Sequence, residues 1–397
     1  MANFNITDAS ALFKQKYGKI SDNVYNSANV TLGRIKKEYN FVGKEMKLPV
    51  PTGFSGGVGS GSLPAANIAN YGDLTLTAKK VYAVCEIDRE TIKASINNEG
   101  AFVEATKHTV QKTVESWTRN ASRILFGDGT GALGSFSGSS SGTATDPIIT
   151  VTAATWKEAN FEEGDFCNVN TLASVFEVVS VDPSTRAVTL QRISGSDDLT
   201  MIGAGTHVVY MQNSRNNDPL GLKGVCDATS STLYGINVGR RWQSVQEAAG
   251  GAGITVDRMN KVMLEVQRRS GKVPDLIVTS FTQYRKIMNL LEDQKQYIVE
   301  PRSPELKGKV SFKGLEFMSA AGAIGIFPER FVEDDRMYFL NTNYITAHHR
   351  PDMGWFNDDG TIFLRSSNAD TYGARYGGYY QNLIIPSFQG VLTGLAT

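Results

Sequence analysis

Hydrophobic and polar residues alternate along one early stretch of the chain. Between residues 74 and 87 this period of two, broken at residues 78–80, predicts strands. The preceding residues 53–64 are rich in glycine and serine, which is typical of a mobile loop when nothing supports it. A loop of this composition on strand-like flanks predicts a long extended hairpin that reaches away from the body of the protein.

A helical period replaces the alternation after residue 100. Apolar residues separated by seven, four, three, four and three positions lie on one face of a helix: Val103, Val110, Val114, Trp117, Ala121 and Ile124. A helix from Gly100 to Phe126 would be about 40 Å long, at about 1.5 Å per residue. Gly127 follows as a candidate C-cap. So long a helix with one apolar face must lie across a large structure.

Strand patterns dominate the next part of the chain. Residues 127–145 are low in complexity and predict a linker. Strands are then expected at residues 148–152, as a hairpin at 175–181 and 187–193, and at residues 207–211. No segment here has a helical pattern, so we expect a small antiparallel barrel or sandwich between two linkers.

The pattern from about Pro219 onward is typical of an α/β domain. Thr255 is expected to cap a helix that ends before Gly271, and residues 275–279 form a short buried strand. Ser280 and Gln283 then form a capping box for a second helix.

Further strands are predicted near the C-terminal end. They lie at residues 337–340 and as a hairpin around residues 357–360. Residues 379–395 are apolar and interrupted by proline, like buried strand and loop.

By contrast, residues 1–47 carry short helical patterns, such as Leu32, Ile35 and Tyr39, without a core of their own. They predict an arm that packs on another structure.

Composition excludes several classes of protein. Lysine and arginine number 40, as do aspartate and glutamate, so the overall charge demands neither nucleic acid nor an anionic membrane as partner. No stretch approaches the roughly 20 apolar residues that a membrane span needs, and no secretory signal is present. The three cysteines are far apart, which disfavours a disulfide framework or a zinc site: Cys85, Cys167 and Cys226.

The even balance conceals an acidic segment. Residues 146–213 contain nine acidic and three basic side chains, so they carry a net charge of −6 and the remainder carries +6. An acidic segment tolerates solvent, and a mildly basic remainder suits proximity to DNA without sequence preference. A merely solvated acidic surface explains the same count about as well.

Glycine-rich motifs match enzyme patterns but lack the required context. Gly129, Gly131 and Gly134 fit a dinucleotide-binding pattern, which needs a strand before it and a helix after it. Here a long helix precedes it and a serine-glycine tract follows. The segments 53–57 and 138–142 fit the pattern of a hydrolase nucleophile elbow, but neither is followed by a helix. We interpret all three as loops or linkers.

Candidate metal ligands are equally sparse. His348, His349 and Asp352 could be part of a metal site, but the other histidines, His108 and His207, lie in separate segments. Residues 357–360 lack the ligand spacing of a calcium loop and predict a turn. We therefore predict no catalytic, cofactor-binding or metal-ligating residues, no cofactor and no enzyme.

The order of these parts resembles the major capsid protein of tailed bacteriophages, which has the Hong Kong 97 fold. Residues 76–90 resemble the strand that leads from the extended loop into the peripheral domain, and residues 221–225 the entry to the axial domain. Residues 275–284 resemble a strand–helix unit of that domain, and residues 386–395 the closing segment. Two features depart from the pattern: no long helical scaffold segment precedes the arm, and the β-rich part is not in the minimal fold.

The resemblance implies an α+β capsid fold with an inserted all-β domain. Its expected parts are an N-terminal arm (1–47), an extended loop (48–80), a peripheral domain with a spine helix (81–127), an inserted β-rich domain (128–218), an axial α/β domain (219–369) and a C-terminal return to the peripheral domain (370–397).

The implied function is a shell subunit without an active site. It would assemble in the cytoplasm of the host bacterium as hexamers and pentamers of an icosahedral or prolate head around double-stranded DNA. Expected partners are further copies of the chain, a portal, a separate scaffolding or decoration protein, and packaged DNA in non-specific proximity, but no membrane. The alternatives are an encapsulin-like compartment shell and, from another class, a hydrolase or adhesin with an accessory β domain.

Overall fold

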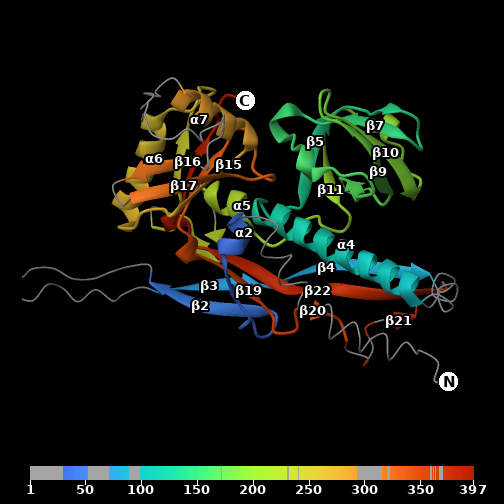
Figure 1. Ribbon diagram of the computed structural model, residues 1–397. Helices are drawn as coiled ribbons and strands as arrows, with labels where there is room; N and C mark the ends of the chain where they lie inside the picture. The colour runs from blue at the N-terminus through green and yellow to red at the C-terminus, as the bar shows by residue number, and fades with distance from the viewer. Residues whose placement is uncertain are drawn as a thin grey trace, which may run out of the picture.

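The computed structural model describes residues 30–51, 71–88, 99–170, 172–229, 232–239, 241–292, 315–319, 322–357, 360, 362, 364–365 and 370–397. Figure 1 shows their arrangement: a long sheet with one long helix across it, and two further bodies on the same side of the sheet as that helix. One of these bodies consists mainly of strands, and the other combines a sheet with helices. The protein is therefore of the α+β class, as predicted.

The long sheet is organised around β22 (Thr371–Ile384). The antiparallel strand β4 (Lys79–Asp88) runs along one edge of β22. Three short strands follow one another along the other edge: β19 (Ile345–His349), β20 (Gly354–Trp355) and β21 (Leu364–Arg365). The strand β1 (Lys36–Glu38) adds to β19 in parallel. The hairpin predicted around residues 357–360 is thus wrong, because β20 and β21 pair with β22 rather than with each other; residues 358–359 lie outside the described part.

The long helix is α4 (Glu99–Leu125), within one residue of its predicted bounds. It lies across the face of β4 and β22 (Figure 1). Val114, Trp117, Ala121 and Ile124 on its predicted apolar face are all buried. Gly127 follows the helix and donates its N–H to the Ile124 carbonyl, 3.0 Å away, but its φ is not positive, so the expected left-handed cap is absent there.

The hairpin flanks are β2 (Glu45–Pro51) and β3 (Tyr71–Thr77). They pair antiparallel from Glu45 opposite Thr77 to Pro51 opposite Tyr71, which confirms the predicted strands. The glycine-rich tip lies outside the described residues. Ahead of the hairpin, α2 (Val30–Arg34) buries Leu32, but the predicted helical spacing fails at Tyr39, because the chain leaves the helix at Ile35 to form β1.

Seven strands form a separate β unit, defined here as residues 132–211. They are β5 (Ala132–Ser137), β6 (Ser141–Gly142), β7 (Pro147–Thr150), β8 (Phe166–Val169), β9 (Val175–Asp182), β10 (Ala187–Ser194) and β11 (Thr206–Met211), in the order β5-β11-β8-β9-β10-β7-β6. The 3-10 turns are η2 (Ala153–Thr155), η3 (Glu158–Asn160) and η4 (Leu199–Met201). The Thr152 N–H donates to the Ser135 carbonyl at 2.7 Å, which joins the chain after β7 to β5 and brings the sheet close to a barrel.

The β unit confirms one sequence prediction and corrects another. The hairpin of β9 and β10 turns where predicted, between Asp182 and Ala187. The linker expected at residues 127–145 is wrong, because it contains β5 and β6. Leu133 and Phe136 are buried in the core of the unit, and the burial of these two residues outweighs the glycine and serine content around them.

The third body has a six-stranded sheet. Its order is β14 (Val245–Ala248), β23 (Gly390–Thr393), β18 (Met337–Leu340), β15 (Leu276–Thr279), β17 (Gly322–Pro328) and β16 (Leu315–Ser319). The helices α6 (Val256–Ser270) and α7 (Phe281–Glu292) lie beside this sheet (Figure 1). The short α5 (Leu222–Cys226) lies between the sheet and α4. Thr255 caps α6 through its Oγ1, and Gly271 ends it at φ 70°, as predicted.

The capping box of α7 is half confirmed. The Gln283 N–H donates to Ser280 Oγ at 3.2 Å. The Gln283 side chain does not reach back to Ser280, because its Nε2 donates to the carbonyls of Asp334 and Ala396, each 2.7 Å away. Gln283 therefore ties the helix to the C-terminal end of the chain. In the described part of the chain, no helix is long and apolar enough to cross a membrane.

Candidate assembly site

The hairpin of β2 and β3 is anchored at its base and open at its far end. Leu74 and Leu76 are almost fully buried in the core that also contains the face of α4, while Tyr71 at the far end is 67% exposed. The Gln381 Nε2 donates to the Thr77 carbonyl at 3.2 Å, and the Ala78 N–H donates to the Lys44 carbonyl at 3.1 Å. The hairpin therefore leaves the body in a defined direction and presents an exposed aromatic residue.

The helix α4 is fixed to the long sheet by an indole ring. Trp117 is fully buried, its ring meets the Tyr376 ring edge to face at a centroid distance of 5.5 Å, and its Nε1–H donates to the Val81 carbonyl at 3.3 Å. One residue thus contacts both β4 and β22. This side chain attaches the helix to the two longest strands of the sheet.

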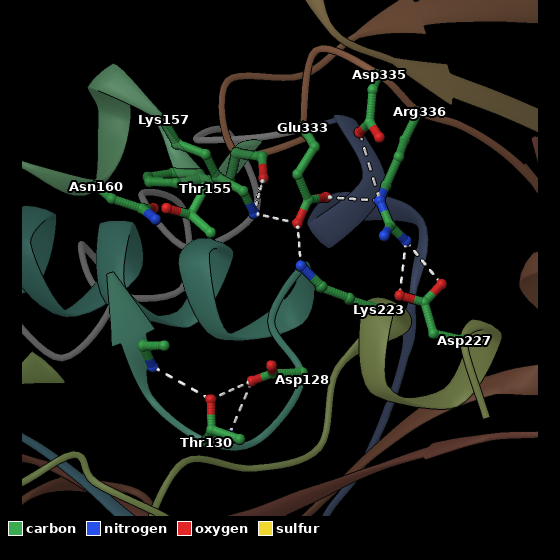
Figure 2. A network of polar contacts seen from close by, with 12 residues as sticks. Asp128, Thr130, Thr155, Lys157, Asn160, Lys223, Asp227, Glu333, Asp335 and Arg336 are labelled. Carbon is green, nitrogen blue, oxygen red and sulfur yellow. Dashed lines mark hydrogen bonds and ion pairs between the residues drawn. The ribbon is translucent and has the colours of Figure 1, made fainter. Parts of the chain in front are cut away.

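A network of charged side chains connects the β unit, α5 and the third body, and Figure 2 shows it from close by. We call it the polar junction: Lys157, Lys223, Asp227, Glu333 and Arg336. The Glu333 carboxylate lies 2.9 Å from the Nζ of Lys157 in the β unit and 2.9 Å from the Nζ of Lys223 on α5. The Arg336 guanidinium lies 2.6 Å from Asp227, at the end of α5.

Burial makes each charge of the polar junction depend on an oppositely charged partner. The Glu333 side chain is 7% exposed and the Lys157 side chain 14%. Burial alone would raise the pKa of Glu333, but the charges of Lys157, Lys223 and Arg336 outweigh it and lower this pKa to about 2. Burial lowers the pKa of Lys157, and Glu333 opposes that shift. The side chains of the polar junction stay charged because each one has an oppositely charged partner. Removal of one partner would therefore leave a buried charge uncompensated.

A second set of ion pairs holds the β unit against α4. Arg119 donates to Glu162 and to Asp165, and Arg330 contacts Glu162 at 2.8 Å. At the end of the helix, Arg123 pairs with Asp218 at 2.9 Å, and both side chains are buried. The β unit therefore has a fixed position on the body although it has a separate core.

The sequence motifs do not come together. Gly129 and Gly131 lie in a left-handed turn between α4 and β5, so no helix N-terminus follows them as a dinucleotide site requires. Residues 138–140 lie between β5 and β6, residues 141–142 form β6, and residues 53–57 lie outside the described part.

His348 and His349 pack within the long sheet and against the segment around β1. His348 Nδ1 lies 2.9 Å from Asn40 Oδ1, and the His349 ring stacks between the rings of Tyr39 and Tyr380, at centroid distances of 5.4 and 5.0 Å. Burial lowers the pKa of His349 to about 3, so this ring is neutral at physiological pH. Among the described residues, no group of three or more potential ligands is placed to hold a metal ion.

No sequence motif predicts the polar junction. Glu333 and Arg336 belong to a stretch, residues 329–336, in which six of eight residues are acidic or basic, a pattern usually found on solvated loops. Lys157 follows Trp156 without any motif. The one available signal was the concentration of charge in 329–336, and its burial could be known only from the fold.

Comparison with known proteins rests on structure. Neither a protein-family model nor a curated protein matches the sequence. A chain from the capsid asymmetric unit of cyanophage A-1(L) superposes on 92% of this chain, over 91% of its own length, with a TM-score of 0.52 and 10% sequence identity. The chain has the fold of a phage capsid protein. The capsid fold agrees with the expectation from the order of elements in the sequence.

Two further solved structures are less similar to this capsid fold. The capsid of an empty GTA particle shares 9% identity over 92% of this chain and 90% of that one, with a TM-score of 0.46. A holo-encapsulin complex from Synechococcus elongatus shares 6% identity over 91% and 85%, with a TM-score of 0.44. Both scores lie below 0.5, so the fold assignment rests on the cyanophage chain.

Proposed function

We propose that this chain is the major capsid protein of a tailed bacteriophage. In this proposal, hexamers and pentamers of the chain form an icosahedral or prolate head around double-stranded DNA. The observation that carries it is the capsid fold, which spans 92% of the chain. The anchored hairpin of β2 and β3 supports it, because an element that leaves the body in a fixed direction suits contact with a neighbour in a closed symmetric lattice.

The capsid fold suggests which part of a shell subunit each segment of the chain forms. We assign the arm to residues 1–47, the extended loop to 48–80, the peripheral domain with α4 as spine helix to 81–127, the inserted β-rich domain to 128–218, the axial domain to 219–369, and the C-terminal return to 370–397.

The β unit would be a module inserted into the shell domain and placed on the outer surface. Its separate core and its net charge of −6 over residues 146–213 support this placement, since negative charge there avoids the genome. The ion pairs of Arg119 and the polar junction would hold the module as a rigid platform. Its role would be contact between neighbouring subunits or attachment of a decoration protein.

The wider setting follows from the shell role. The chain would be a structural component of the virion without catalytic activity, assembled in the host cytoplasm. A portal would be a partner, and packaged DNA would lie near the inner face without sequence-specific contacts. A separate scaffolding protein would be a further partner.

Electron microscopy of the purified full chain tests the proposal. Closed particles of uniform size are expected. A shell function would be contradicted if the chain stays monomeric both alone and when co-expressed with a scaffolding protein from its own genome. Particle content then separates the two shell candidates. Native particles should protect double-stranded DNA from nuclease, whereas an encapsulin-like shell would enclose a protein cargo. Monomers that hydrolyse a substrate would favour the enzyme alternative.

A further inference from the structure

Tyr234 occupies a backbone conformation that its residue type disfavours. It joins two short strands, β12 (Thr232–Leu233) and β13 (Ile236–Asn237), whose Leu233 and Ile236 are paired. The two loop residues have positive φ, 54° at Tyr234 and 83° at Gly235, which is a type I′ arrangement. Asparagine followed by glycine is the usual pair there, and a bulky aromatic at the first position is an outlier. Some contact of the side chain must compensate for this backbone strain.

The contacts of Tyr234 reach two separate elements. Its backbone carbonyl accepts a hydrogen bond from the Thr75 N–H at 2.8 Å, on β3 of the projecting hairpin. Its phenol donates to the Asn382 carbonyl at 2.8 Å and accepts from the Ile384 N–H at 3.4 Å, both on β22. One residue therefore connects the hairpin to the central strand of the long sheet.

The surroundings hold the turn against the edge of β3. The Trp242 Nε1–H donates to the Leu233 carbonyl at 3.1 Å. A Cβ at Gly235 would lie 3.4 Å from the Asp73 carbonyl oxygen, which shows how closely the turn approaches β3. Burial raises the pKa of the Tyr234 phenol, so the hydroxyl keeps its proton and remains a donor throughout the physiological range.

We propose that Tyr234 is the positioning residue that sets the direction of the β2–β3 hairpin relative to the long sheet. Leu74 and Leu76 hold the base of the hairpin by burial, which has no directional preference. The two hydrogen-bonding ends of Tyr234 add direction, because they fix the edge of β3 with respect to β22. This inference rests on the proposed shell function, since the direction of the hairpin decides where it meets a neighbouring subunit.

Three variants of the full chain test the proposal. Tyr234→Phe removes the phenol bridge and keeps the ring. Tyr234→Asn also removes the bridge but suits the type I′ turn better. Tyr338→Phe is the matched control, because Tyr338 is a buried tyrosine whose hydroxyl has no hydrogen-bond partner among the described residues. Two quantities are measured in the unassembled subunit: the hydrogen-exchange rate of the Thr75 amide and the melting temperature. The particles that each variant forms are then imaged by electron microscopy.

Both Tyr234 variants should exchange the Thr75 amide about tenfold faster than the parent chain, with little change in melting temperature, and the control should not. Their particles should be fewer and irregular in size. Unchanged Thr75 protection in both variants would overturn the proposal, as would faster exchange combined with normal particles. If the parent chain forms no particles while Thr75 responds as expected, the proposed function fails and the bracing by Tyr234 stands.

Discussion

The Nζ of Lys157 lies 2.9 Å from the Oε1 of Glu333, and the two residues belong to different bodies of the protein. Lys157 stands in the β unit, and Glu333 stands in the segment before β18 of the third body. The same carboxylate meets Lys223 of α5. Glu333 is thus the point at which the β unit, α5 and the third body are joined.

Glu333→Gln should destabilise the protein by about 3 kcal/mol, because it leaves buried cations without their shared counter-charge. Urea unfolding followed by circular dichroism measures the change. The control is Glu265→Gln, which removes a carboxylate paired with Arg268 and Arg269 on the surface of α6 and should cost much less. Equal losses in the two variants would contradict the role given to the polar junction.

The stability that Glu333 contributes should disappear in acid. Its pKa in the folded protein is about 2, below the ordinary value of 4.5, so the unfolded chain binds a proton more readily than the folded one. The contribution is therefore complete above pH 4.5 and declines as the pH falls from about 4.5 to about 2. The difference in unfolding free energy between the parent chain and Glu333→Gln should be constant above pH 5 and should narrow below it. A difference that stays constant down to pH 2.5 would count against the assignment.

Residues 128–218 should fold when expressed alone. Phe136, Phe176 and Val209 belong to a core that lies within this segment, and the Ser135–Thr152 hydrogen bond joins the chain after β7 to β5. Far-ultraviolet circular dichroism should show β structure and a cooperative melt. Phe176→Asp in the same segment serves as the unfolded reference. A segment whose spectrum equals that reference would show that the β unit depends on the body.

Deletion of residues 53–62 should block particle formation and leave a folded subunit. The deleted residues are the glycine-rich tip of the hairpin, while Leu74 and Leu76 at its base remain in the core. Electron microscopy and a melting curve measure the two effects. Normal shells from this variant would show that the tip is dispensable for assembly.

Local signals in the sequence predicted elements whose stabilising contacts are close along the chain. Thr255 and Gly271 mark the ends of α6, and the turn at Asp182 marks the β9–β10 hairpin, because caps and tight turns use residues within a few positions of each other. The order of such elements was enough to indicate the capsid fold.

Elements stabilised by distant partners were missed. The sequence predicts a linker at β5 because its partner β11 lies some seventy positions further along, and a strand with two buried apolar residues has little pattern of its own. The predicted hairpin at residues 357–360 failed because β22 offers both flanking strands a better edge. The polar junction combines residues from three segments, and no spacing rule connects Lys157 with Glu333.

The positions of β22 and β23 in the chain decide when the two sheets can first close. β22 forms the middle of the long sheet, and β23 lies between β14 and β18 in the third body, yet both come from residues 371–393. A nascent chain on the ribosome cannot close either sheet before these residues emerge, and such late, non-local pairing also slows folding. Tyr234 lacks its partners on β22 until then. If the chain is a shell subunit, as proposed, two chains under synthesis on one messenger RNA would not yet have the sheet that braces the hairpin, and could not associate through it.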